Sequence, residues 1–235
     1  MSRNKPVVAI DGPAGAGKTT VTRRVADALG YTLVDTGALY RGVALAARRR
    51  AVSWDDEAAV ADVARDLAAQ GALRFEAGGA RLCLGAEDVS TAIRSQEIAE
   101  GASKVSAWPG VRAALLGMQR ALGEAGGVVL EGRDIGTVVF PDAEAKFFLT
   151  ASVAVRAERR FAELRARGVE TTLDAVKAEV EARDVRDSTR SAAPLKQARD
   201  AVLVDSSERS IDQVVDFISA RVRDVETRLT VADSG

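Results

Sequence analysis

The chain has 235 residues, of which 47% are hydrophobic and 29% are charged, and 33 lysines and arginines against 34 aspartates and glutamates give a formal net charge of −1. This composition is typical of one α/β domain with an insertion, or of two small domains, and the balanced charge gives no bulk attraction for nucleic acid or an anionic membrane. Because the sequence contains no histidine, Ser-His-Asp and Cys-His nucleophile pairs, HExxH zinc sites and imidazole bases are excluded.

The single cysteine, Cys83, can form neither an internal disulfide nor a cysteine-rich metal site. It lies in an alternating apolar run, which predicts a half-buried strand residue and a reducing compartment. The first apolar stretch stops at Asp11, and no uninterrupted apolar segment approaches the ~18 residues that span a bilayer. We therefore expect a cytoplasmic protein without membrane association.

The N-terminal segment alternates short β-branched runs with helical patterns. A strand is predicted over 6–10, a helix that is closed by Gly30, a strand over 32–34 and a helix over about 38–49. Ser53 to Asp56 matches a capping box and predicts a helix to about Gln70.

The period then changes to that of strands. Residues 73–75 and 81–84 predict a hairpin with a turn at Gly78-Gly79, and a third short strand is predicted near 87–89. An antiparallel hairpin within a βα alternation indicates an inserted subdomain over residues 60–95, which leaves 1–59 and 96–235 as the core.

Helical patterns resume at Ser95, and three more apolar strands are predicted over 128–130, 146–149 and 201–204. A helical hairpin is expected over 153–167 and 172–186, and a last helix follows the capping box Ser210 to Gln213. Five strands separated by helices predict an α/β fold, in which a five-stranded parallel sheet has helices on both faces.

The strongest motif is the full GxxxxGK[ST] pattern Gly12-Pro13-Ala14-Gly15-Ala16-Gly17-Lys18-Thr19, placed between a predicted strand and a predicted helix. Its glycines let consecutive N–H groups point at phosphate oxygens, and the helix adds the positive end of its dipole. Lys18 supplies a mobile charge for the β- and γ-phosphates, and the hydroxyl of Thr19 can bind Mg²⁺. The sequence therefore predicts a P-loop that binds ATP.

Polar clusters follow two other strands, at residues 35–41 and 131–137, and the parallel sheet would bring both to the P-loop side. Two groups of arginines, at 156, 159 and 160 and at 183, 186 and 190, predict a lid over about 153–190 that closes on a polyphosphate. A P-loop does not identify the acceptor. UMP, another nucleotide, shikimate, dephospho-coenzyme A and a non-enzymatic ATP-dependent switch remain alternatives.

Four segments together resemble the bacterial cytidylate kinases: residues 11–18, Asp35-Thr-Gly-Ala-Leu-Tyr-Arg, Glu131-Gly-Arg-Asp-Ile-Gly-Thr-Val-Val-Phe-Pro and Arg183-Asp-Val-Arg-Asp-Ser-Thr-Arg. The resemblance runs from about Pro6 to Phe217. The predicted hairpin insertion matches the enlarged nucleoside-monophosphate-binding domain of these enzymes.

The resemblance implies transfer of the γ-phosphoryl group of ATP to CMP or dCMP with Mg²⁺, by a monomer that needs no nucleic acid. It implies that Thr36, Arg133 and Arg190 hold the acceptor phosphate, that Asp187 and Arg183 meet the ribose, and that Ser103, Arg112 and Asp134 read cytosine. Tyr40 is a further implied CMP contact, Thr20, Arg156 and Arg160 are further ATP contacts, and the implied catalytic residues are Lys18, Arg133, Arg160, Arg183 and Arg190. The family usually has serine at the position of Thr36, which keeps the hydroxyl and adds a methyl group.

Overall fold

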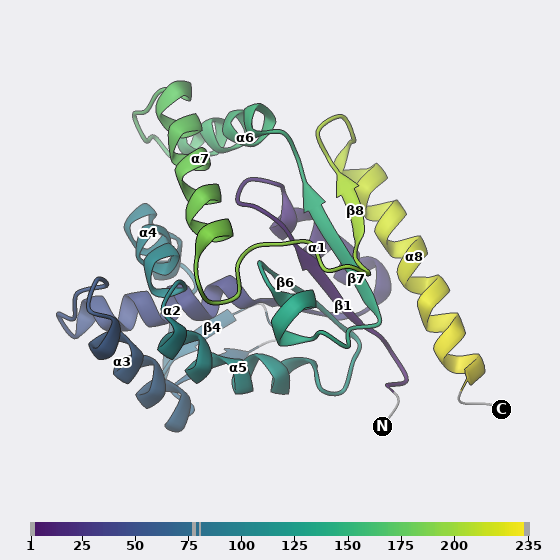
Figure 1. The fold of residues 1–235 in the computed structure, drawn as a ribbon, viewed down its shortest axis with the longest axis horizontal. Helices are drawn as coiled ribbons and strands as arrows, with labels where there is room; N and C mark the ends of the chain where they lie inside the picture. The colour runs from purple at the N-terminus through teal and green to yellow at the C-terminus, as the bar shows by residue number, and fades with distance from the viewer. Residues whose placement is uncertain (1–2, 77–78, 80, 233–235) are drawn as a thin grey trace.

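A five-stranded parallel sheet forms the centre of the protein in the computed structural model, which describes residues 3–76, 79 and 81–232. The strand order is β2-β6-β1-β7-β8, and all four pairings are parallel, so the predicted fold class is confirmed. The arrowheads of β7 and β8 point toward the hairpin of α6 (Val153–Ala166) and α7 (Leu173–Thr189) (Figure 1). The strands are β1 (Val7–Asp11), β2 (Thr32–Asp35), β6 (Val128–Gly132), β7 (Ala145–Thr150) and β8 (Val202–Asp205).

Alternate residues of β1 supply the two faces of this sheet. Val8 and Ile10 pack into a cluster with α1 (Lys18–Leu29) and α8 (Ile211–Ala232), whereas Val7 and Ala9 face the π-helical turn η2 (Ile135–Val139) and α5 (Pro109–Gly123). All five residues of β1 are buried, which explains its uninterrupted apolar sequence up to Asp11.

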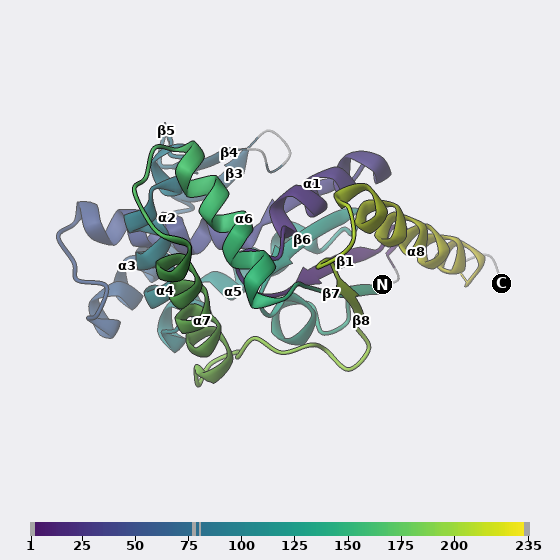
Figure 2. The ribbon, with the colours of Figure 1, turned by 90° about the horizontal axis from the view of Figure 1, so that it is seen from above.

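A second, antiparallel sheet consists of β3 (Leu73–Glu76), β4 (Arg81–Leu84) and β5 (Glu87–Asp88), which confirms the predicted hairpin and third strand. It lies with α2 to one side of the main sheet, and α8 lies on the other side (Figure 2). Gly78 of the predicted turn lies outside the described residues. Cys83 is in β4 as expected, but it is buried rather than half-buried.

The small sheet shares one apolar cluster with four helices, and it approaches α2 closely because Gly42 has no side chain: a Cβ there would lie 2.5 Å from Leu73 Cδ1. The four helices are α2 (Thr36–Arg49), α3 (Glu57–Ala69), α4 (Gln96–Val105) and α5, and a 3₁₀ turn, η1 (Ala92–Arg94), precedes α4.

The two predicted capping boxes have different outcomes. Ser210 and Gln213 exchange hydrogen bonds of 2.9 and 3.2 Å, as predicted. The box at Ser53 is wrong, because the carboxylate of Asp56 accepts from Ala59 N at 3.0 Å and the helix begins at Glu57. An aspartate is as good an N-cap as a serine, and here it lies directly before the helix.

Helices α6 (Val153–Ala166) and α7 (Leu173–Thr189) form the expected helical hairpin beyond the carboxyl ends of the strands (Figure 1). Their contact is a small apolar cluster that includes Leu164 and Val176. Over the part of the chain that the structure describes, no helix is long and apolar enough to cross a membrane.

Substitution of Leu115 tests how tightly the shared apolar cluster is packed, because this side chain of α5 is 0% exposed. We expect Leu115→Ala to lower the free energy of unfolding by about 2 to 5 kcal/mol, the cost of a cavity in a packed core. Urea unfolding measures this change. Val231, which is 69% exposed on α8, is the control, and Val231→Ala should change the value by less than about 0.5 kcal/mol. Equal effects of the two substitutions would contradict the packing described.

Candidate active site

The P-loop joins β1 to α1 and has the backbone that its glycines permit. Gly15 and Gly17 have φ of 76° and 85°, and Gly17 is the N-cap of α1. A Cβ on Gly12 would lie 1.9 Å from the carbonyl oxygen of Leu149, so this position has no room for a side chain. The loop therefore presents backbone N–H groups and a helix N-terminus at the carboxyl edge of the sheet.

Lys18 is buried at the start of α1, and its Nζ donates to the carbonyl oxygens of Gly12 and Pro13 at 2.7 Å each. Burial, together with the charge of Arg133, lowers the pKa of Lys18 below its ordinary value, while Glu131 acts in the opposite direction. An anion beside this ammonium would stabilise its charged form. A polyphosphate in the loop would therefore raise the pKa of Lys18.

Glu131 faces the P-loop from the neighbouring strand. The hydroxyl of Thr19 donates to its two carboxylate oxygens at 3.0 and 3.2 Å. Asp35 is its register partner in β2, so two carboxylates lie on adjacent strands near this hydroxyl. Burial raises the pKa of Glu131 to about 7, and the charge of Asp35 acts in the same direction. These hard oxygen groups are of the kind that Mg²⁺ binds directly or through water.

Arginines and aspartates from three elements form a second cluster, which we call the acceptor cluster: Arg112, Arg133, Asp134, Arg183, Asp187 and Arg190. Arg133 Nε donates to Asp187 at 2.8 Å, Arg112 donates to Asp134, and Arg190 lies 3.6 Å from Asp134. Burial opposes ionisation of Asp187, but the charges of Arg133 and Arg183 outweigh it and lower its pKa. Burial and the charge of Arg133 lower the pKa of Arg183 to about 10.

The structure shows what surrounds four of the residues that the sequence assigned to CMP. Its guanidinium carbon is 5.4 Å from the centre of the Tyr40 ring, and the Tyr40 hydroxyl accepts from Gln119 at 3.4 Å. The hydroxyl of Ser103 is buried without a hydrogen-bond partner in the described structure. The Thr36 hydroxyl donates to the carbonyl oxygen of Glu131 at 2.7 Å.

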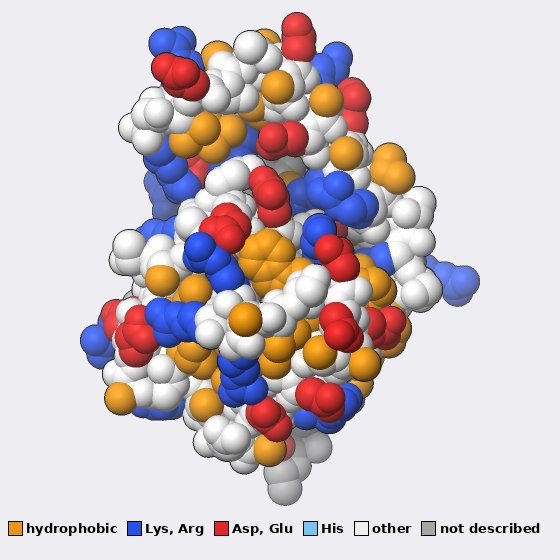
Figure 3. All heavy atoms as spheres, turned by 90° about the vertical axis from the view of Figure 1, so that its left-hand side faces the viewer, with side chains coloured by type: hydrophobic (Ala, Val, Ile, Leu, Met, Phe, Trp, Pro, Cys, Tyr) orange, Lys and Arg blue, Asp and Glu red, His pale blue; other side chains and the backbone are white. Residues whose placement is uncertain are grey.

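One cavity of about 760 Å³ joins the P-loop to the acceptor cluster. Viewed from the side of α3 and α4, lysine and arginine side chains gather where α6 and α7 meet the body of the protein (Figure 3). The predicted site residues that line the cavity are Ala14, Gly15, Ala16, Gly17, Lys18, Thr19, Thr20, Thr36, Tyr40, Arg112, Arg133, Asp134, Arg160, Arg183, Asp187 and Arg190. Gly12, Pro13, Ser103 and Arg156 are not among the lining residues.

Arg156 makes its hydrogen bonds to other groups of the protein. It is 4% exposed, donates to both carboxylate oxygens of Asp184 at 2.9 and 2.6 Å, and reaches the carbonyl oxygen of Ala14 at 3.1 Å. The structure therefore links Arg156 to the outside of the P-loop and to α7. Arg160 differs, since it lines the cavity and donates to Gln96 at 2.5 Å.

Three cavity-lining residues had no individual contact assigned from the sequence. They are Glu131, Arg41, which pairs with Asp35, and Arg159, which was predicted only as one of the lid arginines and donates to the carbonyl oxygen of Ser206 at 2.7 Å. Glu131 and Arg41 belong to the polar clusters at the strand ends, which is a signal that could have found them. The contact of Arg159 depends on a loop 47 residues away.

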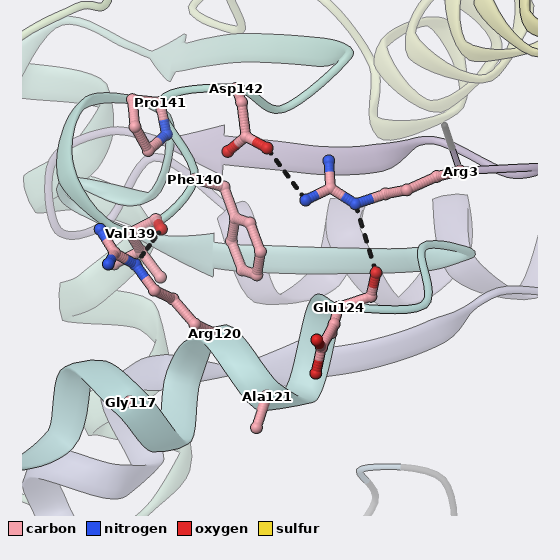
Figure 4. A pocket seen from close by; sticks show the side chains of 9 residues that line it. All are labelled: Arg3, Gly117, Arg120, Ala121, Glu124, Val139, Phe140, Pro141 and Asp142. Atoms are coloured by element: carbon pink, nitrogen blue, oxygen red, sulfur yellow. Dashed lines mark hydrogen bonds and ion pairs between the residues drawn. The ribbon is translucent and has the colours of Figure 1, made fainter. Parts of the chain in front are cut away.

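A second hollow, of about 450 Å³, lies beside α5 and the segment after η2 (Figure 4). Arg3 there pairs with Asp142 at 3.0 Å and with Glu144 at 2.9 Å, and Arg120 donates to the carbonyl oxygens of Val138 and Val139. Its two arginines are thus engaged by the protein. The chemistry of phosphate binding is concentrated in the larger cavity.

A parallel sheet, a P-loop and a facing arginine cluster define a P-loop kinase, in which a nucleotide phosphate chain meets a second anionic substrate. The family model described as cytidylate kinase matches residues 8–224. The chain belongs to the cytidylate kinase family. A protein named cytidylate kinase from Syntrophotalea carbinolica is 53% identical over 212 residues, covering 89% of this chain and 88% of that protein. Another from Citrifermentans bemidjiense is 50% identical over 235 residues, covering 100% and 99%.

The raised pKa of the buried Glu131 carboxyl group predicts that its contribution to stability depends on pH. A carboxyl group whose pKa rises from 4.5 to about 7 on folding binds its proton more tightly in the folded state, so its contribution to stability is lost as pH rises through that interval. Glu131→Gln cannot ionise and keeps an oxygen for Thr19. We therefore expect its free energy of unfolding, relative to the unmodified protein, to increase from pH 4.5 to 7.

Urea unfolding at a series of pH values in this interval measures that difference, and subtraction removes the contribution of other titrating groups. A difference that stays constant, or that decreases with pH, would contradict the burial of an ionisable Glu131.

Proposed function

We propose that this chain transfers the γ-phosphoryl group of ATP to the phosphate of CMP or dCMP, giving ADP and CDP or dCDP. The observation that carries this proposal is the single cavity that has the P-loop at one end and the acceptor cluster at the other. Membership of the cytidylate kinase family supports the choice of acceptor.

ATP binds with its phosphates in the P-loop, where backbone N–H groups and Lys18 contact the β- and γ-phosphates. The Thr19 hydroxyl and the Glu131 carboxylate suit Mg²⁺, because both offer oxygen to a hard cation. Among the described residues, no group of three or more acidic or cysteine side chains forms a separate metal cage. This favours an ion that enters with the phosphates; when bound, Mg²⁺ neutralises charge on them.

The acceptor phosphate is held by Arg133, Arg190 and the hydroxyl of Thr36. Arginine suits this task, because its planar group donates two hydrogen bonds to neighbouring phosphate oxygens. Asp187, which Arg133 keeps ionised, accepts from a ribose hydroxyl, and Arg183 lies beside it. The paired aspartates keep the arginines in place before the phosphate arrives.

Cytosine is read by Ser103, Arg112 and Asp134, with Tyr40 packed beside the arginine. The base has an amino donor next to ring-nitrogen and carbonyl acceptors, so it needs an acceptor such as Asp134 and a donor such as Arg112. Uracil has a carbonyl oxygen where cytosine has its amino group. It would leave the acceptor unpaired, which costs about 1 to 3 kcal/mol.

Catalysis then needs no covalent intermediate. The transition state is loose, and the rate depends on aligning the acceptor oxygen with the γ-phosphorus while Lys18, Arg160 and Arg183 neutralise the phosphate oxygens. We infer that residues 60–95 act as the acceptor-binding subdomain and that residues 153–190 act as a lid that excludes water. Because all these residues come from one chain, a monomer is sufficient.

The experiment is a coupled assay of ADP formation with CMP, dCMP, UMP, AMP, shikimate or no acceptor. We expect CMP and dCMP to be phosphorylated, with kcat/KM about tenfold or more above that of UMP. Preference for shikimate or AMP would favour the alternative kinases. ADP formation that no acceptor increases would overturn the proposal.

Lys18→Ala is the control that connects this activity to the P-loop. We expect a folded protein that has lost about 3 kcal/mol of transition-state stabilisation, equivalent to more than ~100-fold in kcat. Circular dichroism verifies the fold. Near-native turnover of this variant would remove Lys18 from the mechanism.

A further inference from the structure

Asp11 is a buried carboxylate that the proposed mechanism does not use. It is the last residue of β1, directly before Gly12 of the P-loop, and it is 4% exposed. Its Oδ1 accepts from Ile135 N and its Oδ2 accepts from Gly136 N, both at 2.8 Å. These two N–H groups begin η2, the turn that follows Arg133 and Asp134. Asp11 therefore joins the donor loop to the acceptor loop by two hydrogen bonds.

The start of η2 needs these acceptors from outside. The first N–H groups of a helical turn have no partner within the turn, and the residue at the cap position commonly supplies one. Here that residue is Asp134, which makes no side-chain cap hydrogen bond, because its carboxylate pairs with Arg112. Asp11 caps the turn in its place, and the Asp134 carboxylate pairs with Arg112 instead.

Only a carboxylate offers two equivalent acceptors to two successive N–H groups. Within the described structure Asp11 has no ion-pair partner: the nearby Lys146 ammonium donates to the Pro141 carbonyl and to Asp200 instead. Burial raises the pKa of Asp11 to about 6, although the hydrogen bonds from Gly136 and Ile135 lower it. The two backbone N–H groups thus stabilise the ionised form, and the charge of Lys18 acts in the same direction.

We propose that Asp11 is a positioning residue that sets Arg133 and Asp134 at their working distance from the P-loop, by capping η2 from the end of β1. Asp11 is not among the residues that line the cavity. It acts through the backbone of residues 134–136. The inference rests on the proposed function, and it adds a residue that couples acceptor recognition to the donor loop.

Asp11→Asn tests the proposal. The amide oxygen can accept one N–H, but the NH₂ group would face the other N–H, so the start of η2 must shift. We expect the KM for CMP to rise about tenfold and the preference for CMP over UMP to fall by a similar factor, as for the loss of one hydrogen bond to a charged acceptor. The KM for ATP should stay within about twofold, because the P-loop keeps its own contacts.

Glu144→Gln is the matched control. Glu144 Oε2 accepts from Val7 N at 2.8 Å, so it makes the same kind of bond at the opposite end of β1. We expect Glu144→Gln to affect thermal stability but neither KM value nor the choice between CMP and UMP. If both variants change the CMP parameters equally, or if Asp11→Asn changes stability alone, the positioning role is wrong.

Asp11→Ser, which keeps one acceptor without a charge, replaces Asp11→Asn if that variant does not fold. If neither variant folds, amide hydrogen exchange of the unmodified protein, measured with and without ADP, tests the role of Asp11 instead. ADP in the P-loop should slow exchange at Ile135 and Gly136 more than at Val7, and an equal or smaller effect there would overturn the coupling. The proposed function and the role of Asp11 can be tested separately. If the unmodified protein does not phosphorylate CMP, the proposed function is wrong. If the protein phosphorylates CMP and substitution of Asp11 does not change the CMP parameters, only the role of Asp11 is wrong.

Discussion

The parallel pairing of β1 with β6 is the constraint on which the site depends. The two strands run side by side, with Ile10 opposite Glu131 and Asp11 opposite Gly132. Because both strands end at the same edge, the P-loop that leaves β1 and the Gly-Arg-Asp loop that leaves β6 emerge next to each other. An antiparallel β6 would place Arg133 at the far edge of the sheet. The adjacency of the P-loop and the Gly-Arg-Asp loop is therefore set by strand direction, before any side chain contributes.

Cationic groups are concentrated around the cavity and repel one another. The protein offsets this repulsion with carboxylates. Arg133 and Arg183 repel each other, and burial together with this repulsion lowers the pKa of Arg183. Asp187 accepts a hydrogen bond from Arg133, and its negative charge offsets the repulsion between the two arginines. A phosphate that entered the cluster would bring negative charge to arginines that ion pairs already hold in place. Such preorganisation favours phosphoryl transfer.

The sequence predicted the sheet and the P-loop, and most of the predicted site residues line the cavity. These features depend on local signals: apolar runs, a glycine motif and polar residues after strands. Sequence reasoning failed where a competing contact decides. Asp56 replaces Ser53 as a helix cap. The ion pair of Arg156 with Asp184 was not expected either, and the ATP contact of Arg156 stays a prediction. Asp11 shows the limit most clearly, since its partners Ile135 and Gly136 lie more than 120 residues away and are backbone atoms that no side-chain pattern reveals.

We propose that one cavity holds two nucleotides with their phosphates in contact. Calorimetric titration with adenosine and cytidine joined through their 5′ positions by five phosphates tests it most directly. We expect one molecule to bind per chain, more tightly than ATP or CMP alone, and to displace both nucleotides. A compound that displaced ATP while CMP stayed bound, or that bound no more tightly than ATP, would contradict it.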